Sequence, residues 1–199
     1  MTARAALLVP IAVALLARLL TGPHPIDDAY ITFRYSRNLA EGLGLVYNPG
    51  EWVLGTTTPL WAVLLAGGYR LGLTDLPWLA TVLSALCDAG SAALLAGLGL
   101  RMGWRPAGAL LLGVAWALNP MSIAFANGGM ETSLFVLVTL ATLTLAARAR
   151  HLPLAAAIAG VATFVRPEGA LLATAVVGWT LVTHRQQTLL AAVSAGVPM

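Results

Sequence analysis

Long apolar runs separated by short polar segments make up most of the chain. The runs have the lengths of helices rather than strands, and several approach the roughly 20 residues that an α-helix needs to cross a bilayer. They cover residues 5–20, 59–72, 78–100, 107–126, 133–147, 152–165 and 170–182. The pattern predicts an all-α, polytopic transmembrane helix bundle of about seven spans.

The order of these runs predicts one transmembrane module over residues 1–199. A first helix (5–21) precedes a polar loop (22–58), and the further helices occupy 59–183. Arg4 before the first run is also typical of a signal peptide, but no small-x-small cleavage site follows Leu20, so we expect an uncleaved helix. The last apolar run, 188–199, is too short to cross a membrane and predicts the start of a truncated helix.

Composition supports a membrane protein. Apolar residues make up 59% of the chain and charged residues 10%, whereas soluble domains are nearer 45–50% and about 25%. These values exclude a disordered chain, a nucleic-acid-binding module and an ordinary soluble enzyme. The single Cys87 lies in an apolar run and is interpreted as a small core residue.

The arginines predict which loops face the cytoplasm. By the positive-inside rule, Arg4, the 101–105 loop, the 148–151 loop and residues 184–185 are cytoplasmic. Strict alternation of the predicted spans places the 101–105 loop on the opposite side. The sequence therefore requires one extra crossing or one re-entrant segment between residues 59 and 100.

The polar loop after the first run contains a predicted amphipathic helix. Asp27 and Asp28 are expected at its N-terminal cap and first turn, and Gly42 is expected to end it after about Glu41. Spacings of three and four residues place five polar side chains on one face, namely Asp27, Tyr30, Arg34, Arg37 and Glu41. We expect this helix to lie at the membrane surface on the extracytoplasmic side.

The charges of this helix suit the handling of a proton and a phosphate. A carboxylate of Asp27 or Asp28 can take a proton from an attacking hydroxyl, and the two together can hold a divalent cation such as Mg²⁺ or Mn²⁺. The guanidiniums of Arg34 and Arg37 can hold a phosphate leaving group. Glu41 is interpreted as a helix-stabilising residue.

Five ionisable residues lie in or at the ends of the apolar runs, and each should face protein or water. Arg18 lies near a helix end and is expected to snorkel to the interface. Asp88 is expected to pair with an arginine of another helix or to cap a helix break. Glu131 is expected in the first turn of a new helix, and Arg166 and Glu168 flank a proline at a helix start. No His or Cys spacing indicates a zinc site.

Several motifs resemble the GT-C superfamily of multi-spanning glycosyltransferases, which use polyprenyl-phosphate-linked sugars. The nearest subgroup contains the mycobacterial arabinofuranosyltransferases and mannosyltransferase-like proteins. The motifs follow one another in the expected order: Asp27-Asp28-Ala29-Tyr30-Ile31, Arg34-Tyr35, Asn38-Leu39-Ala40, Gly42-x-Gly44, Tyr47-Asn48-Pro49-Gly50-Glu51, Gly55-x-Thr57-x-Pro59-Leu60-Trp61, Asn127-Gly128-Gly129-Met130-Glu131-Thr132 with Leu134-Phe135, and Arg166-Pro167-Glu168-Gly169. The resemblance covers residues 26–179 and implies the N-terminal portion of a longer enzyme.

The resemblance implies an inverting transfer of a sugar from a polyprenyl phosphate to a hydroxyl of a glycan, lipid or protein acceptor. The reaction would take place at the outer face of a bacterial plasma membrane. Asp27 or Asp28 is implied as the base or metal ligand. The expected substrate-binding residues are Arg34, Arg37, Asn48, Glu51, Glu131, Arg166 and Glu168.

Two other functions remain open from the sequence. The intramembrane charges are also found in transporters, although the two halves of the chain show no convincing repeat. The early end of the chain also fits a non-catalytic remnant or a subunit that works with a longer partner.

Overall fold

The computed structural model describes residues 1–53, 55–183 and 196. Within these residues every regular element is a helix, which confirms the all-α prediction. The predicted helix start at 188–199 lies outside the described residues, apart from residue 196. The helices are α1 (Ala3–Thr21), α2 (Asp27–Ala40), α3 (Pro59–Arg70), α4 (Leu76–Arg101), α5 (Pro106–Ala117), α6 (Pro120–Asn127), α7 (Thr132–Ala146), the 3₁₀ turn η1 (Ala149–His151), α8 (Leu152–Val165) and α9 (Gly169–Thr183).

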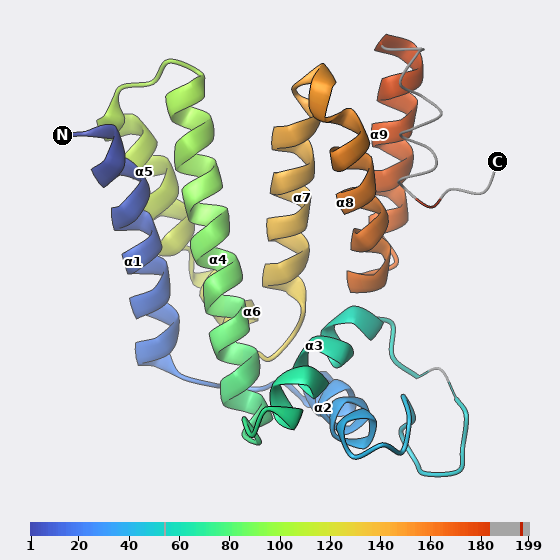
Figure 1. Cartoon of the computed structure of the whole chain (residues 1–199). Coiled ribbons are helices and arrows are strands. Elements are labelled where there is room, and N and C mark those ends of the chain that lie inside the picture. Colours follow the sequence, from blue (N-terminus) through green and yellow to red (C-terminus); the bar gives the residue numbers. More distant parts are fainter. Residues whose placement is uncertain (54, 184–195, 197–199) are drawn as a thin grey trace.

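Most of the helices form an upright bundle, and α2 and α3 lie across one end of it (Figure 1). Helices α1, α4 and α5 stand together on one side, and α7, α8 and α9 stand on the other, joined through contacts between α4 and α7. Helices α2 and α3 lie beside one another beneath the bundle. We call this the α2–α3 end. The connections from α4 to α5 and from α7 to α8 lie at the opposite end.

Prolines set where five of these helices begin. Pro59, Pro77, Pro106, Pro120 and Pro153 each occupy the first or second position of their helix. A proline is well tolerated there because its missing N–H has no partner within the helix in any case. The limits of the apolar runs agree with most helix boundaries to within a few residues.

Two helices, α1 and α4, are long and apolar enough to cross a membrane. The pair α5 and α6 makes a third candidate span if it counts as one helix bent by 46°. Helices α7, α8 and α9 are apolar but shorter. Two to three candidate spans are thus present among the described residues, and the count of about seven stays a prediction.

Residues 59–72, which the sequence predicts as a span, are not among the candidate spans of the described residues. They form α3, which has 12 residues and spans only about 18 Å at 1.5 Å per residue. Its buried face packs on α2 and on the start of α4 in a cluster that includes Phe33, Trp61, Leu65 and Leu79. Helix α3 is shorter than the hydrocarbon core, lies across the end of the bundle (Figure 1) and buries its apolar face against protein. The length of an apolar run alone does not distinguish a membrane span from a helix that packs on protein at the end of the bundle.

The bend between α5 and α6 follows from Pro120. The side chain of Asn119 accepts hydrogen bonds from the backbone N–H groups of Met121 and Ser122, at 2.9 and 3.2 Å, and so caps α6. These N–H groups would otherwise continue the hydrogen-bonding pattern of α5. The carbonyl of Ala117 is left without its helical partner and accepts a hydrogen bond from Arg18 instead.

Candidate functional site

The first turn of α2 is held at one end of the bundle by the connection from α1. Backbone N–H groups of His24 and Ile26 donate to the carbonyls of Asn127 and Gly128, at 2.8 and 3.1 Å. The side chain of Asn127 donates back to the carbonyl of Gly22 at 2.6 Å. These bonds tie the start of α2 to the loop between α6 and α7.

Gly129 in that loop brings three elements together. Its φ is +86°, and a Cβ atom there would lie 2.9 Å from Phe33 Cζ and 3.0 Å from Ala29 Cβ. Its carbonyl accepts a hydrogen bond of 3.1 Å from Trp61 Nε1. Only glycine combines this backbone conformation with such a close approach. Helices α2 and α3 therefore close against the α6–α7 loop.

A polar cavity of about 160 Å³ opens where these elements meet. Asp28 and Thr32 contribute to it from α2, the threonines from the segment before α3, and Met130 from the α6–α7 loop. The lining residues are Asp28, Ile31, Thr32, Gly55, Thr56, Thr57, Thr58 and Met130. One aspartate and four threonines thus line a single small space.

Tyr35 fixes the threonine segment against α2. Its hydroxyl donates to the carbonyl of Val53 at 2.9 Å and accepts from the N–H of Gly55 at 2.8 Å. Within the segment, the Oγ1 atoms of Thr56 and Thr58 lie 3.3 Å apart. The residues that place the hydroxyls at the cavity are therefore themselves held by hydrogen bonds.

The two adjacent aspartates lie in the first turn of α2 as predicted, with Ile26 rather than an aspartate at the N-cap. Neighbouring residues on an α-helix point about 100° apart. Both carboxylates are exposed, but only Asp28 lines the cavity. The described residues contain no group of three or more His, Cys, Asp or Glu side chains suited to a metal ion. A cation at Asp28 would therefore take most of its ligands from water or a bound phosphate.

Arg34, Asn48 and Glu51 form a separate cluster outside the cavity. Arg34 donates to the carbonyl of Tyr47 at 2.9 Å and to Asn48 Oδ1 at 3.1 Å, and lies 4.5 Å from the centre of the Tyr47 ring. Asn48 in turn donates to Glu51 at 3.0 Å. This cluster holds the loop after α2 in place. Arg37 is exposed on the predicted polar face and does not line the cavity either.

Glu131 follows Met130 into the interior and pairs with Arg166. Its Oε1 lies 3.3 Å from Arg166 Nη1, and Glu131 is 2% exposed. It occupies the N-cap position of α7, directly before the first turn in which the sequence places it, and its side chain does not cap that helix. Burial raises the pKa of Glu131, and the nearby Arg166 guanidinium only partly offsets this effect.

Arg166 links this buried carboxylate to a second one at the surface. Its Nη2 donates to Glu168 at 3.1 Å, and its guanidinium lies 5.9 Å from the centre of the Phe135 ring. The hydrogen bond from Arg166 lowers the pKa of Glu168. Residues from the α6–α7 and α8–α9 connections thus meet at the α2–α3 end.

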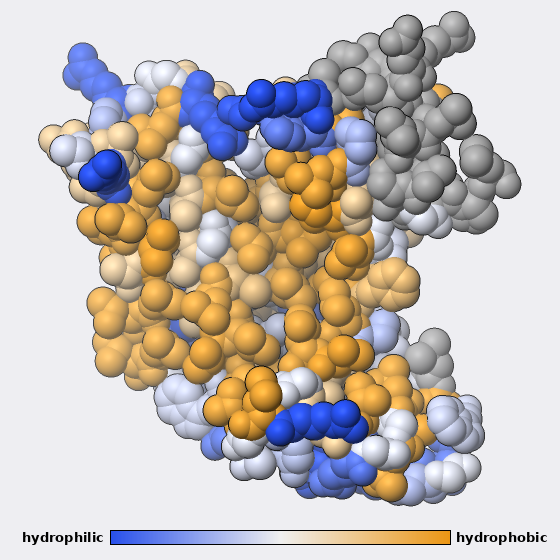
Figure 2. All heavy atoms as spheres, in the orientation of Figure 1, coloured by the Kyte–Doolittle hydropathy of each residue, from blue (hydrophilic) through white to orange (hydrophobic). Residues whose placement is uncertain are grey.

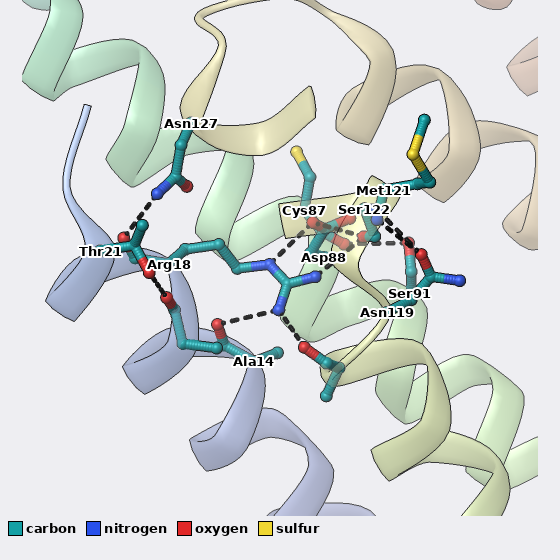
Figure 3. A network of polar contacts seen from close by, with 12 residues as sticks. Ala14, Arg18, Thr21, Cys87, Asp88, Ser91, Asn119, Met121, Ser122 and Asn127 are labelled. Atoms are coloured by element: carbon teal, nitrogen blue, oxygen red, sulfur yellow. Dashed lines mark hydrogen bonds and ion pairs between the residues drawn. The ribbon is translucent and has the colours of Figure 1, made fainter. Parts of the chain in front are cut away.

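A second buried ion pair lies inside the bundle, between α1 and α4 (Figure 3). Arg18 Nε donates to Asp88 Oδ2 at 2.9 Å, and Ser122 Oγ donates to the same oxygen at 3.0 Å. Arg18 also donates to Ser122 Oγ at 2.8 Å and to the carbonyls of Ala14 and Ala117. The snorkelling expectation for Arg18 is wrong, because it is completely buried. The expected pairing of Asp88 with an arginine of another helix is confirmed.

The threonines at the cavity were not among the predicted site residues. Their signal in the sequence was the run of three hydroxyls directly before an apolar segment. Comparisons with known proteins add no further residue roles. No family model, no curated protein and no solved structure matches this chain.

Proposed function

We propose that this chain is the membrane module of a glycosyltransferase that uses a polyprenyl-phosphate-linked sugar, with Asp28 as its base. The observation that carries the proposal is the cavity that Asp28 lines together with Thr32, Thr56, Thr57 and Thr58. The cavity lies at one end of a bundle whose longest helices are apolar enough to span a membrane. A polar lipid headgroup at the membrane surface could reach such a position.

In this proposal Asp28 removes the proton from an acceptor hydroxyl as the hydroxyl oxygen attacks the anomeric carbon of the sugar. The bond between that carbon and the phosphate oxygen breaks, and polyprenyl phosphate leaves with the electron pair. The new bond forms on the opposite face of the sugar, so the configuration at this carbon inverts. The threonine hydroxyls donate to and accept from the hydroxyls of the bound sugar.

The start of α3 can contribute to holding the phosphate. Thr58 is its N-cap residue, and its side chain makes no capping hydrogen bond. Pro59 has no N–H, and the N–H of Ala62 donates to the carbonyl of Thr58. This leaves the N–H groups of Leu60 and Trp61 next to the cavity residue Thr58. The positive end of the helix dipole favours an anion there. Arg34, which pairs with its own loop, is a weaker candidate for this role than the sequence implies.

The distribution of charges supports an extracytoplasmic position for the cavity. The opposite end of the bundle has five arginines and no acidic residue among the described residues, whereas seven of the eight acids lie at the α2–α3 end. The arginines are Arg4, Arg101, Arg105, Arg148 and Arg150. An arginine-rich end is typical of the cytoplasmic side.

The lateral position of α3 supports the same orientation. If α3 does not cross, α4 starts outside and its C-terminal Arg101 is cytoplasmic. Successive crossings by α5 with α6, α7, α8 and α9 then place the 148–151 loop inside and the 166–168 loop outside. Every arginine-rich connection obeys the positive-inside rule in this arrangement, and no extra crossing is needed.

The proposal is tested by transfer in native membranes, where any partner chain is also present. Membranes with the wild-type chain, Asp28→Asn or Glu41→Gln receive radiolabelled polyprenyl-phosphate mannose or arabinose, and label in the acceptor fraction is counted. Loss of a general base typically costs 10²–10⁴-fold in rate, so we expect about that loss for Asp28→Asn. Glu41→Gln removes an exposed acid of the same region, outside the cavity, and should keep wild-type transfer. Unchanged transfer by Asp28→Asn would refute the proposal.

A further inference from the structure

A second charged cavity lies at the opposite end of the bundle, between α4 and the end of α7. It has a volume of about 240 Å³. Arg101 lines it from α4, and Arg148 and His151 line it from the α7–α8 connection. Figure 2 shows strongly hydrophilic side chains along this end of the molecule, above a broad hydrophobic surface.

The walls of this cavity change from apolar to cationic along the helix axes. Leu94 precedes Arg101 by seven residues of α4, which corresponds to about 10 Å of depth at 1.5 Å per residue. Leu145 lines the cavity three residues before Arg148. A molecule that fills the cavity therefore meets leucine side chains below and guanidiniums above.

The two guanidiniums of the cavity have no acidic partner. Neither Arg101 nor Arg148 forms a side-chain hydrogen bond or ion pair with another residue of the described part of the chain. His151 is held in place by Arg150, whose Nε donates to His151 Nε2 at 3.0 Å. By contrast, the guanidinium of Arg166 at the α2–α3 end is neutralised by ion pairs with Glu131 and Glu168. Two arginines that share one cavity without a counter-charge favour an anionic ligand.

We propose that this cavity binds the headgroup of an anionic phospholipid. The phosphate would accept hydrogen bonds from Arg101 and Arg148, since a guanidinium donates in pairs to phosphate oxygens. The glycerol and the upper acyl chain would lie against Leu94 and Leu145. Basic pockets between apolar helices at a membrane surface bind such headgroups in this way. The leucine wall favours a lipid over a free phosphate ion, which would leave that wall in contact with water.

The experiment measures lipid retention by native mass spectrometry of the full chain, purified in mild detergent and titrated with phosphatidylglycerol or phosphatidylcholine. The test variant is the double substitution Arg101→Gln with Arg148→Gln. The matched control is Arg4→Gln with Arg105→Gln, which removes the same charge from the same end but does not touch the cavity. Helicity by circular dichroism and the elution volume establish that both variants are folded.

We expect one tightly retained phosphatidylglycerol per chain and weaker retention of phosphatidylcholine. The test variant should weaken phosphatidylglycerol binding by roughly thirty-fold, because each arginine near anionic lipid contributes about fivefold. The control should bind within about twofold of wild type, because its arginines do not line the cavity. A third variant, Arg101→Lys with Arg148→Lys, keeps both charges and should retain most of the binding even if the glutamine variant does not fold.

Three results would overturn the proposal. Equal weakening in the test and control variants would mean that the overall charge of this end attracts lipid without a site. Equal retention of the two lipids by the wild-type chain would mean that the cavity does not select a headgroup charge. Displacement of the lipid by inorganic phosphate at equal concentration would mean that the site binds the free ion. None of these results depends on the reaction proposed for Asp28.

Discussion

Two buried carboxylates, Asp88 and Glu131, each pair with an arginine, and the two pairs differ in access. The side chains of Arg18 and Asp88 are 0% and 1% exposed. In the second pair Glu131 is equally hidden at 2%, but the side chain of Arg166 is 33% exposed. The first pair lies inside the bundle, whereas the second lies at the α2–α3 end, one residue along the chain from the cavity residue Met130.

The difference in exposure indicates that the Arg18–Asp88 pair supports the structure, whereas the Arg166–Glu131 pair is accessible enough for binding. Arg18 donates to three other helices as well as its own and satisfies the carbonyl that Pro120 leaves open at the end of α5. Arg166 is shared between Glu131 and Glu168 and reaches the surface. One carboxylate oxygen of each pair, Asp88 Oδ1 and Glu131 Oε2, has no hydrogen-bond partner among the described residues, so the pairs differ in access and not in this respect. We therefore expect changes to the first pair to affect folding, and changes near the second to affect function and pH response.

The largest expected effect comes from breaking the first pair, Arg18 and Asp88. Asp88→Ala would leave the Arg18 guanidinium buried without its counter-charge, which typically costs about 3–5 kcal/mol. The free energy of unfolding, measured by denaturant titration in detergent, should fall by about that amount. The double variant Arg18→Met with Asp88→Leu removes both charges and should be considerably more stable than Asp88→Ala alone. Equal stability of Asp88→Ala and wild type would contradict the structural role of the pair.

A smaller effect is expected from Gly129→Ala, next to the cavity residue Met130. The added Cβ would approach Phe33 and Ala29 within 3.0 Å, in a backbone conformation that alanine rarely adopts. Left-handed backbone strain and overpacking together cost about 2–4 kcal/mol. Thermal unfolding in detergent measures the loss. Gly67→Ala, on α3 with open space around it, is the matched control and should unfold close to wild type; the same loss in both variants would contradict the close approach.

In the second pair, Glu131 should make the free energy of unfolding depend on pH. Burial raises its pKa above the ordinary value of 4.5, so the folded state binds this proton more tightly than the unfolded state. This contribution to stability is fully present below about pH 4.5 and is lost as pH rises through the raised pKa. Glu131→Gln cannot ionise and should remove that decline. Unfolding midpoints measured across this range check the prediction, and identical pH profiles for the two proteins would oppose it.

The smallest effect is expected from Arg34→Ala. Its hydrogen bonds to Tyr47 and Asn48 are exposed, and such contacts contribute about 0.5–1.5 kcal/mol each at most. Global stability should change little, whereas the loop after α2 should be cut faster by limited proteolysis. Arg37→Ala, an exposed neighbour on the same helix, provides the control. A large loss of transfer in Arg34→Ala at unchanged proteolysis would instead support the role in phosphate binding that the sequence implies.

The sequence predicts the helices well because prolines and apolar runs mark their limits. The run 152–165 coincides with α8, and the polar face of α2 carries the five exposed residues that its spacing predicts. The run 59–72 predicts a span, but it forms the 12-residue helix α3, whose buried apolar side chains face protein at the end of the bundle. Only the contacts of Trp61 and Phe33 distinguish this helix from a span.

The site is less predictable than the fold because it depends on where side chains meet. The sequence presents Asp27 and Asp28 as equivalent, and only the placement of α2 turns one of them toward the cavity. Arg18 looks like a residue that can reach the interface, yet Asp88, 70 residues away, holds it inside. Arg34 pairs with a loop 13 residues along the chain, which removes it from the cavity. Contacts across such distances leave no local signal.

The central claim is that Asp28, and not its neighbour, acts at the cavity. The most direct test is the ratio of transfer rates of Asp27→Asn and Asp28→Asn in native membranes at matched protein levels. The two variants differ by one position and lose the same charge from an exposed carboxylate. We predict near-wild-type transfer for Asp27→Asn and a loss of about 10²–10⁴-fold for Asp28→Asn. Equal rates in the two variants, or the larger loss in Asp27→Asn, would contradict the account.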